Sequence, residues 1–241
     1  EYAKLFNIPV ISHCEDEDLS KGFVHEGGAS VISGIEPIPA IAEEIIVKRD
    51  MTIAKYVKTP IHLTHISTKG SVESIGEMKK KYDLITCDTC PHYFTLTDRA
   101  TLSFDTNTKV NPPLRSKEDV KAIKEGLREE IIDIIATDHA PHDLTSKDVE
   151  FDIASSGISG LETALGLSMA LVHEGVLSMS MLIKKFTENP AKLLNLPYGG
   201  LAHGDAADII VFDPDYEWTV DKNNFVSKGK NTPFNGWRLK G

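Results

Sequence analysis

Residues 132–142 read Ile-Asp-Ile-Ile-Ala-Thr-Asp-His-Ala-Pro-His, a β-branched apolar run followed at once by polar side chains. The run predicts a strand over 132–138, with Asp138 at its carboxyl end. Three earlier runs have the same short apolar form: 8–14, 61–66 and 84–87. Segments with helical periodicity alternate with these runs: 36–56, 68–82, 116–130, 161–174 and 179–188. Strands that alternate with helices predict an α/β protein with a parallel sheet.

Polar side chains stand at the carboxyl ends of three of these predicted strands: His13, His65 and Asp138. In a (β/α) barrel, the carboxyl ends of the strands carry the active site. Neutral imidazole and carboxylate are good ligands for zinc or a similar divalent ion, so we expect a metal site there. His62 lies three residues before His65 and faces the opposite side of a strand, so His65 is the expected ligand of the two. The alternative for each histidine is a core or surface group that binds no metal.

The overall charge narrows the classes of function. The chain has 241 residues, with 26 Lys and Arg against 36 Asp and Glu, which gives a net charge of −10. This acidic balance argues against general binding to nucleic acid and against docking on anionic membranes. No apolar run reaches the roughly 18 residues of a membrane span, and we expect no signal peptide at the start. Three cysteines fit a reducing cytoplasm better than a disulfide scaffold.

The character of the chain changes after Pro197, where glycine and other turn-forming residues gather. Two strands are predicted beyond this turn-rich stretch: 207–213 and 217–220. We therefore expect a boundary near residue 200. The strand–helix unit would occupy residues 1–199, and a small β segment would occupy residues 200–241.

Three further motifs could carry chemistry. Cys87 and Cys90 form a Cys-x-x-Cys pair, which would suit a redox or zinc module, although no second pair completes a zinc ribbon. Two prolines follow Asn111 and would hold an extended loop that presents its amide. The small residues of 155–160 precede a predicted helix and could offer backbone N–H groups to an anion or a carbonyl. A rigid connector is the alternative explanation for the Asn111 loop.

Taken together, these motifs resemble those of the long-chain bacterial dihydroorotases, in the amidohydrolase superfamily. The matching segments run almost from end to end of the chain: 12–16, 62–67, 110–115, 136–142, 160–164, 188–191 and 204–209. The most specific of them is Asp-His-Ala-Pro-His at 138–142.

The resemblance implies a metal-binding (β/α)₈ TIM-type barrel with a small β-sandwich. Residues 1–199 would be the second half of this barrel, and residues 200–241 would be part of the sandwich. The family's first-strand His-x-His-x-Arg motif, its bridging aspartate and the last sandwich strands have no match in this sequence. Half of a barrel leaves parallel edge strands bare. We therefore expect the 241 residues to be inactive by themselves.

The resemblance also implies roles for particular residues. His13 and His65 would be metal ligands, and Asp138 would be both a ligand and the general acid–base. The metal would be one or two Zn²⁺ ions, or another divalent cation. Several groups would hold the substrate: Asn111, His142 and the backbone of Ser156 and Gly157. The polar loop 143–156 is a candidate for a mobile flap.

The implied reaction is the reversible hydrolysis of the cyclic amide of dihydroorotate to N-carbamoyl-aspartate, in pyrimidine biosynthesis. Family members are often homodimers, and some associate with aspartate transcarbamoylase. Other cyclic amidohydrolases share the fold, so a dihydropyrimidinase, a hydantoinase or an allantoinase stays open, and so does a dihydroorotase-like scaffold without activity. The second histidine of the 138–142 motif favours a substrate that carries a carboxylate.

Overall fold

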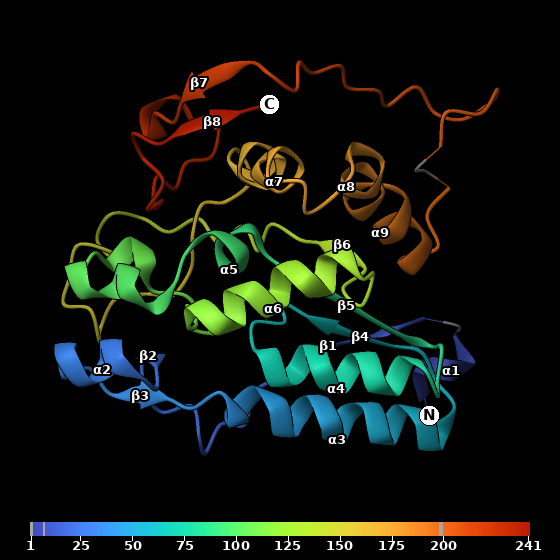
Figure 1. The fold of residues 1–241 in the computed structure, drawn as a ribbon, viewed down its shortest axis with the longest axis horizontal. Helices are drawn as coiled ribbons and strands as arrows, with labels where there is room; N and C mark the ends of the chain where they lie inside the picture. Colours follow the sequence, from blue (N-terminus) through green and yellow to red (C-terminus); the bar gives the residue numbers. More distant parts are fainter. Residues whose placement is uncertain (1, 7, 198–199) are drawn as a thin grey trace.

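The computed structural model describes residues 2–6, 8–197 and 200–241. Its centre is a parallel sheet with the strand order β1–β4–β5–β6 (Figure 1). The strands have these bounds: β1, Val10–His13; β4, Ile61–Thr64; β5, Ile85–Thr89; β6, Ile134–Ile135. The main helices between them are α3, Ile41–Val57; α4, Lys69–Lys79; and α6, Lys117–Arg128. The predicted α/β class with a parallel sheet is therefore confirmed.

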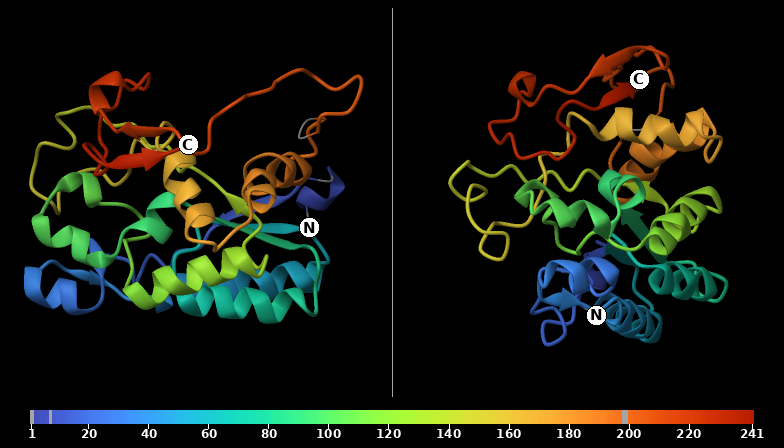
Figure 2. Two further views of the ribbon diagram at one scale, coloured as in Figure 1. Left: turned by 45° about the horizontal axis from the view of Figure 1, so that its top comes forward. Right: turned by 60° about the vertical axis from the view of Figure 1, so that its left-hand side comes forward.

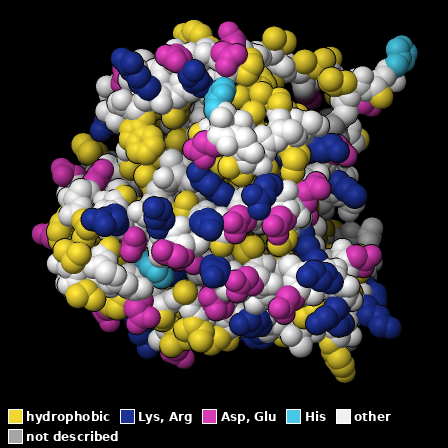
Figure 3. Space-filling view, viewed as in Figure 1, with side chains coloured by type: hydrophobic (Ala, Val, Ile, Leu, Met, Phe, Trp, Pro, Cys, Tyr) yellow, Lys and Arg dark blue, Asp and Glu magenta, His cyan; other side chains and the backbone are white. Residues whose placement is uncertain are grey.

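The helices α3, α4 and α6 form a layer on one side of the sheet, with α3 against α4 and α4 against α6 (Figures 1 and 2). Apolar side chains from both layers are buried between them: Ile46, Met51, Leu63, Ile75, Ile85, Ile123 and Leu127. The outer surface of these helices carries basic and acidic side chains interspersed (Figure 3). Within the described residues, no helix is long and apolar enough to cross a membrane.

Two of these helices begin where local capping chemistry predicts. Thr68 caps α4, and its side chain accepts a hydrogen bond from the backbone N–H of Ser71. Ser116 and Asp119 form a reciprocal capping box at the start of α6, with each side chain accepting from the other residue's backbone N–H at 3.2 Å. Such caps satisfy backbone donors that have no partner inside the helix.

The predicted helix over 36–56 begins too early. The structure starts α3 at Ile41, and residues Pro37–Ile38 form a short strand, β3. This strand pairs in parallel with β2, Val24–His25, and the helix α2, Gly28–Ser33, joins the two. Pro39 explains the difference, because a residue that precedes a proline is pushed out of the helical region and towards an extended conformation.

The elements around β6 are shorter than predicted. The ladder beyond β6 continues only as far as Ala136, whose N–H donates to Thr89, and Asp138 has a left-handed φ of 45°. The predicted helix 161–174 is α7, Ala164–His173. The predicted helix 179–188 divides at Thr187 into α8, Met179–Phe186, and α9, Glu188–Leu193.

The C-terminal segment departs further from expectation. The strand predicted at 217–220 is present as β7, Glu217–Thr219, which pairs in antiparallel fashion with β8, Arg238–Lys240. The strand predicted over 207–213 is wrong. That stretch has no strand in the structure, and the Val211 side chain is 95% exposed. A strand needs a partner for its backbone groups, so a β-rich pattern alone does not produce one.

The segment after residue 200 crosses over α8 and α7 before it reaches β7 (Figures 1 and 2). The expected boundary between residues 199 and 200 falls where residues 198 and 199 lie outside the described part of the chain. Beyond this crossing, apolar residues of 220–239 share a core with apolar residues of 90–167. That second core contains Tyr93, Val110, Ile158, Leu167, Val220, Phe225, Phe234 and Leu239.

Short helices complete the chain. The α-helical ones are α1, Tyr2–Leu5, and α5, Pro91–Thr95; the 3₁₀ ones are η1, Asp98–Ser103, η2, Thr106–Thr108, and η3, Lys222–Asn224.

Candidate active site

The structure brings two of the predicted ligands, His13 and His65, into direct contact. His13 is the last residue of β1, and it lies opposite Thr64 in the β4 ladder, so His65 follows one position later. The Nδ1 atom of His13 is 2.7 Å from the Nε2 atom of His65, and the rings meet edge to face. Adjacent parallel strands therefore place both imidazoles at the carboxyl edge of the sheet.

The contacts of the two rings limit which ring nitrogens can carry a proton. His13 Nε2 lies 2.7 Å from a carboxylate oxygen of Glu15, which only accepts, so this nitrogen carries a proton. One proton lies between His13 Nδ1 and His65 Nε2 across their 2.7 Å contact. The remaining nitrogen, His65 Nδ1, is buried and has no hydrogen-bond partner. Burial and the nearby His13 lower the pKa of His65, which favours the neutral form of its ring.

A buried carboxylate beneath the pair holds the backbone of His65. Asp88 on β5 is 4% exposed, and one of its oxygens accepts from the His65 N–H at 2.6 Å. Its other oxygen accepts from the Thr64 hydroxyl at 2.9 Å and from His62 Nε2 at 2.8 Å. His65 has a left-handed φ of 41°, which a non-glycine residue seldom adopts without such support.

Sequence reasoning missed this role of Asp88. Asp88 lies between Cys87 and Cys90 and was considered only as part of that cysteine motif. His62, its partner, was considered only as the histidine that does not bind metal. The available signal was register. The pairing of Leu63 with Cys87 puts Thr64 beside Asp88, but the sequence alone does not reveal which strands are neighbours.

Asp138 lies among a different group of side chains. Its carboxylate and the ligand atoms of Cys90 and His92 all lie within 4.8 Å of one another, the one group of this kind in 2–6, 8–197 and 200–241. The negative charge of Asp138 also acts on His65, whose pKa it tends to raise against the effect of burial. The structure thus pairs His13 with His65, while Asp138 lies with Cys90 and His92, and that metal-type group does not contain the histidine pair.

His92 was not predicted from the sequence. It is 2% exposed, and its Nε2 atom is buried without a hydrogen-bond partner. Burial, with a contribution from His65, lowers the pKa of His92 to about 3, so the ring is neutral. Two neutral imidazoles, His65 and His92, therefore each hold a bare nitrogen in the interior. Unpaired buried polar atoms are exceptional and point to a missing partner, such as a metal ion.

The cysteine pair has little reactivity. Cys87 and Cys90 are free thiols and are completely buried. Burial raises the pKa of both thiols well above the usual value, which disfavours the thiolate that redox chemistry requires. Cys90 can contribute to the region of Asp138 only as a potential ligand.

Asn111 and Ser156, two predicted substrate-binding residues, line one cavity of about 200 Å³. The amide of Asn111 donates to both oxygens of Glu15 at 3.1 Å, which connects it to His13. Burial tends to raise the pKa of Glu15, but the hydrogen bonds from His13 and Asn111 outweigh it and lower that pKa. The cavity therefore has a hydrogen-bonded carboxylate on the side of the histidine pair.

A lysine that the sequence did not single out lines the same cavity. Lys109 is 5% exposed, and its ammonium group lies 4.5 Å from the centre of the Phe23 ring and donates to Asp152 O at 2.8 Å. Burial lowers its pKa. A buried cation at this place provides local positive charge in a protein that is acidic overall, which suits an anionic ligand.

The other predicted substrate groups contact each other. His142 Nε2 lies 2.9 Å from the backbone oxygen of Ser156. Gly157 has a φ of 134°, and a Cβ there would lie 2.5 Å from Cβ of Ala140, so only glycine fits. The Gly157 N–H already donates to the backbone oxygen of Lys109 at 2.8 Å. This backbone group is therefore engaged within the protein.

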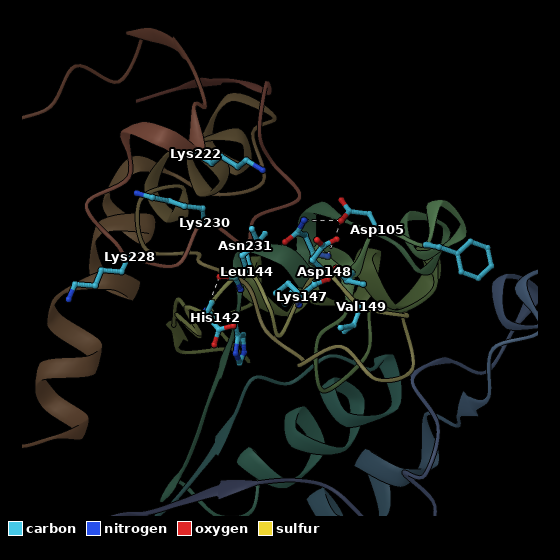
Figure 4. Close-up of a pocket in the computed structure, with 14 residues that line it drawn as sticks. Asp105, His142, Leu144, Lys147, Asp148, Val149, Lys222, Lys228, Lys230 and Asn231 are labelled. Carbon is cyan, nitrogen blue, oxygen red and sulfur yellow. Dashed lines mark hydrogen bonds between the residues drawn. The ribbon is translucent and has the colours of Figure 1, made fainter.

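A separate, larger cavity, of about 560 Å³, is lined by His142 (Figure 4). The loop 143–149 and the C-terminal segment enclose it, and Lys222, Lys228 and Lys230 belong to its wall. Asn231 stands next to His142 in this view and joins the two walls (Figure 4).

Comparison with known proteins identifies the family to which the chain belongs. The model of the amidohydrolase family matches residues 2–238. A dihydroorotase of Syntrophus aciditrophicus is 52% identical over the whole of this chain, and one of Acetivibrio thermocellus is 51% identical. In both cases the match covers 57% of the relative, so this chain spans little more than half of their length.

Solved structures show a similar fold. An L-hydantoinase (dihydropyrimidinase) from Arthrobacter aurescens matches with a TM-score of 0.88 at 25% identity. A dihydropyrimidinase from Brevibacillus agri matches with a TM-score of 0.85 at 22% identity. Each match covers 99% of this chain and 55% of the other. The predicted architecture is thereby confirmed as part of the fold that these proteins share.

Proposed function

Because the chain belongs to the amidohydrolase family, we propose that its protein is a dihydroorotase of pyrimidine biosynthesis. The reaction is the reversible hydrolysis of the cyclic amide of dihydroorotate to N-carbamoyl-aspartate. Relatives about half identical over the whole chain carry the name dihydroorotase, which supports this substrate. The structural observation that carries the proposal is the contact of His13 with His65 at adjacent strand ends, close to the charge of Asp138.

The predicted donors are two imidazoles and a carboxylate, the groups that zinc prefers, and both ring nitrogens of His13 are at present in hydrogen bonds to His65 and Glu15. We propose that His13, His65 and Asp138 hold one or two Zn²⁺ ions, or another divalent metal. The bare buried nitrogens of His65 and His92 support a cation in this region, since neutral imidazole is a preferred ligand. When bound, such an ion lowers the pKa of a water molecule and polarises a carbonyl oxygen.

Asp138 moves the proton in this proposal. In hydrolysis its carboxylate accepts a proton as water oxygen bonds to the ring carbonyl carbon. It then gives that proton to the ring nitrogen as the C–N bond breaks, and the product is the open-chain carbamoyl amino acid. In ring closure the same carboxyl group runs the transfers in reverse.

The substrate carboxylate needs donors and positive charge. We assign this task to Asn111, His142 and the backbone at Ser156 and Gly157. The Gly157 N–H already donates to the backbone oxygen of Lys109. This loop therefore contributes mainly by shaping the wall of the substrate cavity. The buried ammonium of Lys109 provides the local positive charge.

Residues 1–199 would form half of a barrel, and 200–241 part of a β-sandwich. The outer edge of β1 supports this view, because Val10 and Ile11 are 43% and 53% exposed. Parallel strands are normally covered on both faces. We propose that the 241 residues alone turn over no dihydroorotate, while the whole protein does; assaying the two side by side tests this.

A substrate panel tests the proposed reaction against its rivals. The whole protein is assayed with dihydroorotate, dihydrouracil, hydantoin and allantoin, before and after removal of metal by a chelator. We expect hydrolysis of dihydroorotate alone, its loss on chelation, and its return with Zn²⁺. Preference for hydantoin or dihydrouracil would instead favour the activity named for the similar solved structures. Stable, metal-loaded protein with no turnover of any substrate would favour an inactive scaffold.

We also propose a cytoplasmic homodimer, with aspartate transcarbamoylase as a possible partner. The three cysteines are free and buried, which supports a reducing compartment. Light scattering of the whole protein, alone and mixed with the transcarbamoylase, measures both assemblies.

A further inference from the structure

Asn231 is bonded on every side of its amide. It belongs to the C-terminal segment and is 5% exposed. Its Oδ1 atom accepts from the His142 N–H at 2.9 Å and lies 2.7 Å from the Ser159 hydroxyl. Its Nδ2 atom donates to the backbone oxygens of Ala140 at 2.9 Å and Gly157 at 3.0 Å. The amide of Asn231 thus makes hydrogen bonds to two loops, one that contains Ala140 and His142 and one that contains Gly157 and Ser159.

Both loops belong to the proposed substrate site. The first, 139–142, follows Asp138 and contains His142. The second, 155–159, contains Ser156 and Gly157. Apart from Asn231, two contacts connect them: the parallel bridge between His139 and Ile158, and that of His142 Nε2 with the Ser156 backbone oxygen. Asn231 therefore joins the two loops that present the proposed carboxylate-binding groups (Figure 4).

The backbone around Asn231 follows the same loops closely. Its carbonyl oxygen accepts from the Ser159 N–H at 2.8 Å. Gly229 lies so near the first loop that a Cβ there would be 2.6 Å from Cβ of Pro141. This close approach needs glycine and holds the C-terminal segment against the 139–142 loop.

We propose that Asn231 is a positioning residue for substrate binding. It fixes the backbone of His142 relative to Gly157, and so the direction from which the imidazole meets the substrate carboxylate. This inference rests on the proposed dihydroorotase function. It assigns to the C-terminal segment a part in recognition that lies outside the metal ligands and the proton-transferring carboxylate.

The chemistry requires an amide at this place. A carboxylate of the same shape would accept from the His142 N–H as before, but it would face the oxygens of Ala140 and Gly157 without a proton to donate. The Ala140 oxygen would then lose this donor, the Gly157 oxygen would keep only Lys147 Nζ at 3.2 Å, and both would face a carboxylate, so the loops would separate. Asn231→Asp therefore keeps the size of the side chain and replaces its two donated hydrogen bonds with contacts between oxygen atoms.

The experiment measures KM and kcat for dihydroorotate, metal content and melting temperature in the whole protein. For Asn231→Asp we expect KM to rise at least about tenfold, which corresponds to the loss of one or two buried hydrogen bonds. We expect kcat within about threefold of normal and an unchanged metal content. The control is Asn235→Asp, an exposed residue of the same segment whose Oδ1 accepts from the Lys222 N–H, and it should behave as the unsubstituted protein.

A product analogue separates positioning from general loosening. N-carbamoyl-β-alanine lacks the α-carboxylate of N-carbamoyl-aspartate, which is the carboxylate that dihydroorotate carries on its ring. Its inhibition constant should stay the same in Asn231→Asp, while that of N-carbamoyl-aspartate rises in parallel with KM. Equal weakening of both ligands, or a fall in kcat and metal content with KM unchanged, would overturn the inference and assign Asn231 a purely structural role.

Ser159→Ala keeps the test decisive if Asn231→Asp does not fold. It removes the hydroxyl that contacts Asn231 Oδ1 and the Gly229 backbone oxygen, and we expect a smaller rise in KM with the same selectivity for the carboxylate ligand. An unchanged KM in Ser159→Ala would then count against the inference. If the unsubstituted protein hydrolyses no dihydroorotate, the proposed function fails; if it does and neither variant changes KM, only the positioning role fails.

Discussion

The hydrogen-bond partners of the ring nitrogens of His13 and His65 determine which atoms at the carboxyl edge of the sheet are free to bind a ligand. One nitrogen of His13 contacts a carboxylate oxygen of Glu15, and the other contacts His65 Nε2, both at 2.7 Å. The remaining nitrogen of His65 is buried without a hydrogen-bond partner, close to the charge of Asp138, and burial lowers the pKa of this ring. Asp138 is the carboxylate that lies with His92 and Cys90 beside this pair, and we assign the proton transfer to it.

Asp138→Asn tests that role. We expect turnover of dihydroorotate to fall at least about a hundredfold, because an amide cannot accept and return the proton. Stopped assays of the whole protein with metal content measured in parallel provide the readout. The control is Asp148→Asn, an exposed carboxylate in the loop beyond the site, which should leave turnover unchanged. Near-normal turnover of Asp138→Asn with metal retained would remove the assignment.

His142→Ala separates substrate binding from metal binding. The ring contacts the Ser156 backbone oxygen and is not part of the metal-type group around Asp138, so its loss should raise KM for dihydroorotate by about tenfold and leave metal content unchanged. Metal analysis and a KM determination on the same preparation measure both quantities. Loss of metal in this variant would make His142 a ligand instead.

Among the elements, α3, the start of α4 and the loop before α6 meet at a buried ion pair. Arg115 and Glu43 are each 2% exposed, and a guanidinium nitrogen lies 3.6 Å from the carboxylate. Glu43 also accepts from the N–H groups of Ser67 and Thr68 at 3.1 Å. The loop that follows β4 is therefore held by charges from two other elements.

Arg115→Ala should destabilise the protein strongly. Removing the cation leaves the Glu43 carboxylate buried and unpaired, which costs about 3–5 kcal/mol in the free energy of unfolding. Urea unfolding followed by circular dichroism measures this difference. Arg99→Ala is the control, because Arg99 is exposed and its loss should change the free energy by less than about 0.5 kcal/mol. A small effect of Arg115→Ala would mean that water reaches Glu43.

At the scale of the whole molecule, the buried neutral histidine His92 makes folding depend on pH. Burial lowers its pKa from 6.5 to about 3. As the pH falls below 6.5, the unfolded chain binds a proton there and the folded chain does not. Stability is therefore full above pH 6.5 and is lost progressively down to about pH 3.

His92→Gln should flatten this dependence. A single proton contributes at most about 1.4 kcal/mol per pH unit to the slope, and the variant should lose that contribution between pH 6 and pH 4. Urea unfolding at several pH values measures the slope. His203→Gln is the matched control, since His203 is exposed and should leave the slope as it is. Identical slopes for His92→Gln and the unsubstituted protein would show that His92 is protonated in the folded state.

Local chemistry was enough to predict much of the fold and the histidine pair. Side chains such as Thr68 and Ser116 cap the helices that follow them, and apolar runs form strands, because these effects act over a few residues. The placement of His13 and His65 together also follows from strand ends in a parallel sheet. The strand predicted over 207–213 failed for the complementary reason: a strand depends on a neighbour that its own sequence does not specify.

Only the tertiary structure decided which distant residues support the site. Asp88 reaches His62 across 26 positions, Asn111 reaches Glu15 across 96, and Asn231 reaches His142 across 89. Each contact depends on strand register, on the path of a loop or on where the C-terminal segment lies. Hydrophobic periodicity records only whether a residue faces the core, so it cannot identify the partner that a buried polar group finds there. The sequence by itself therefore determined the elements and the candidate ligands, and the packing of those elements determined the groups that orient them.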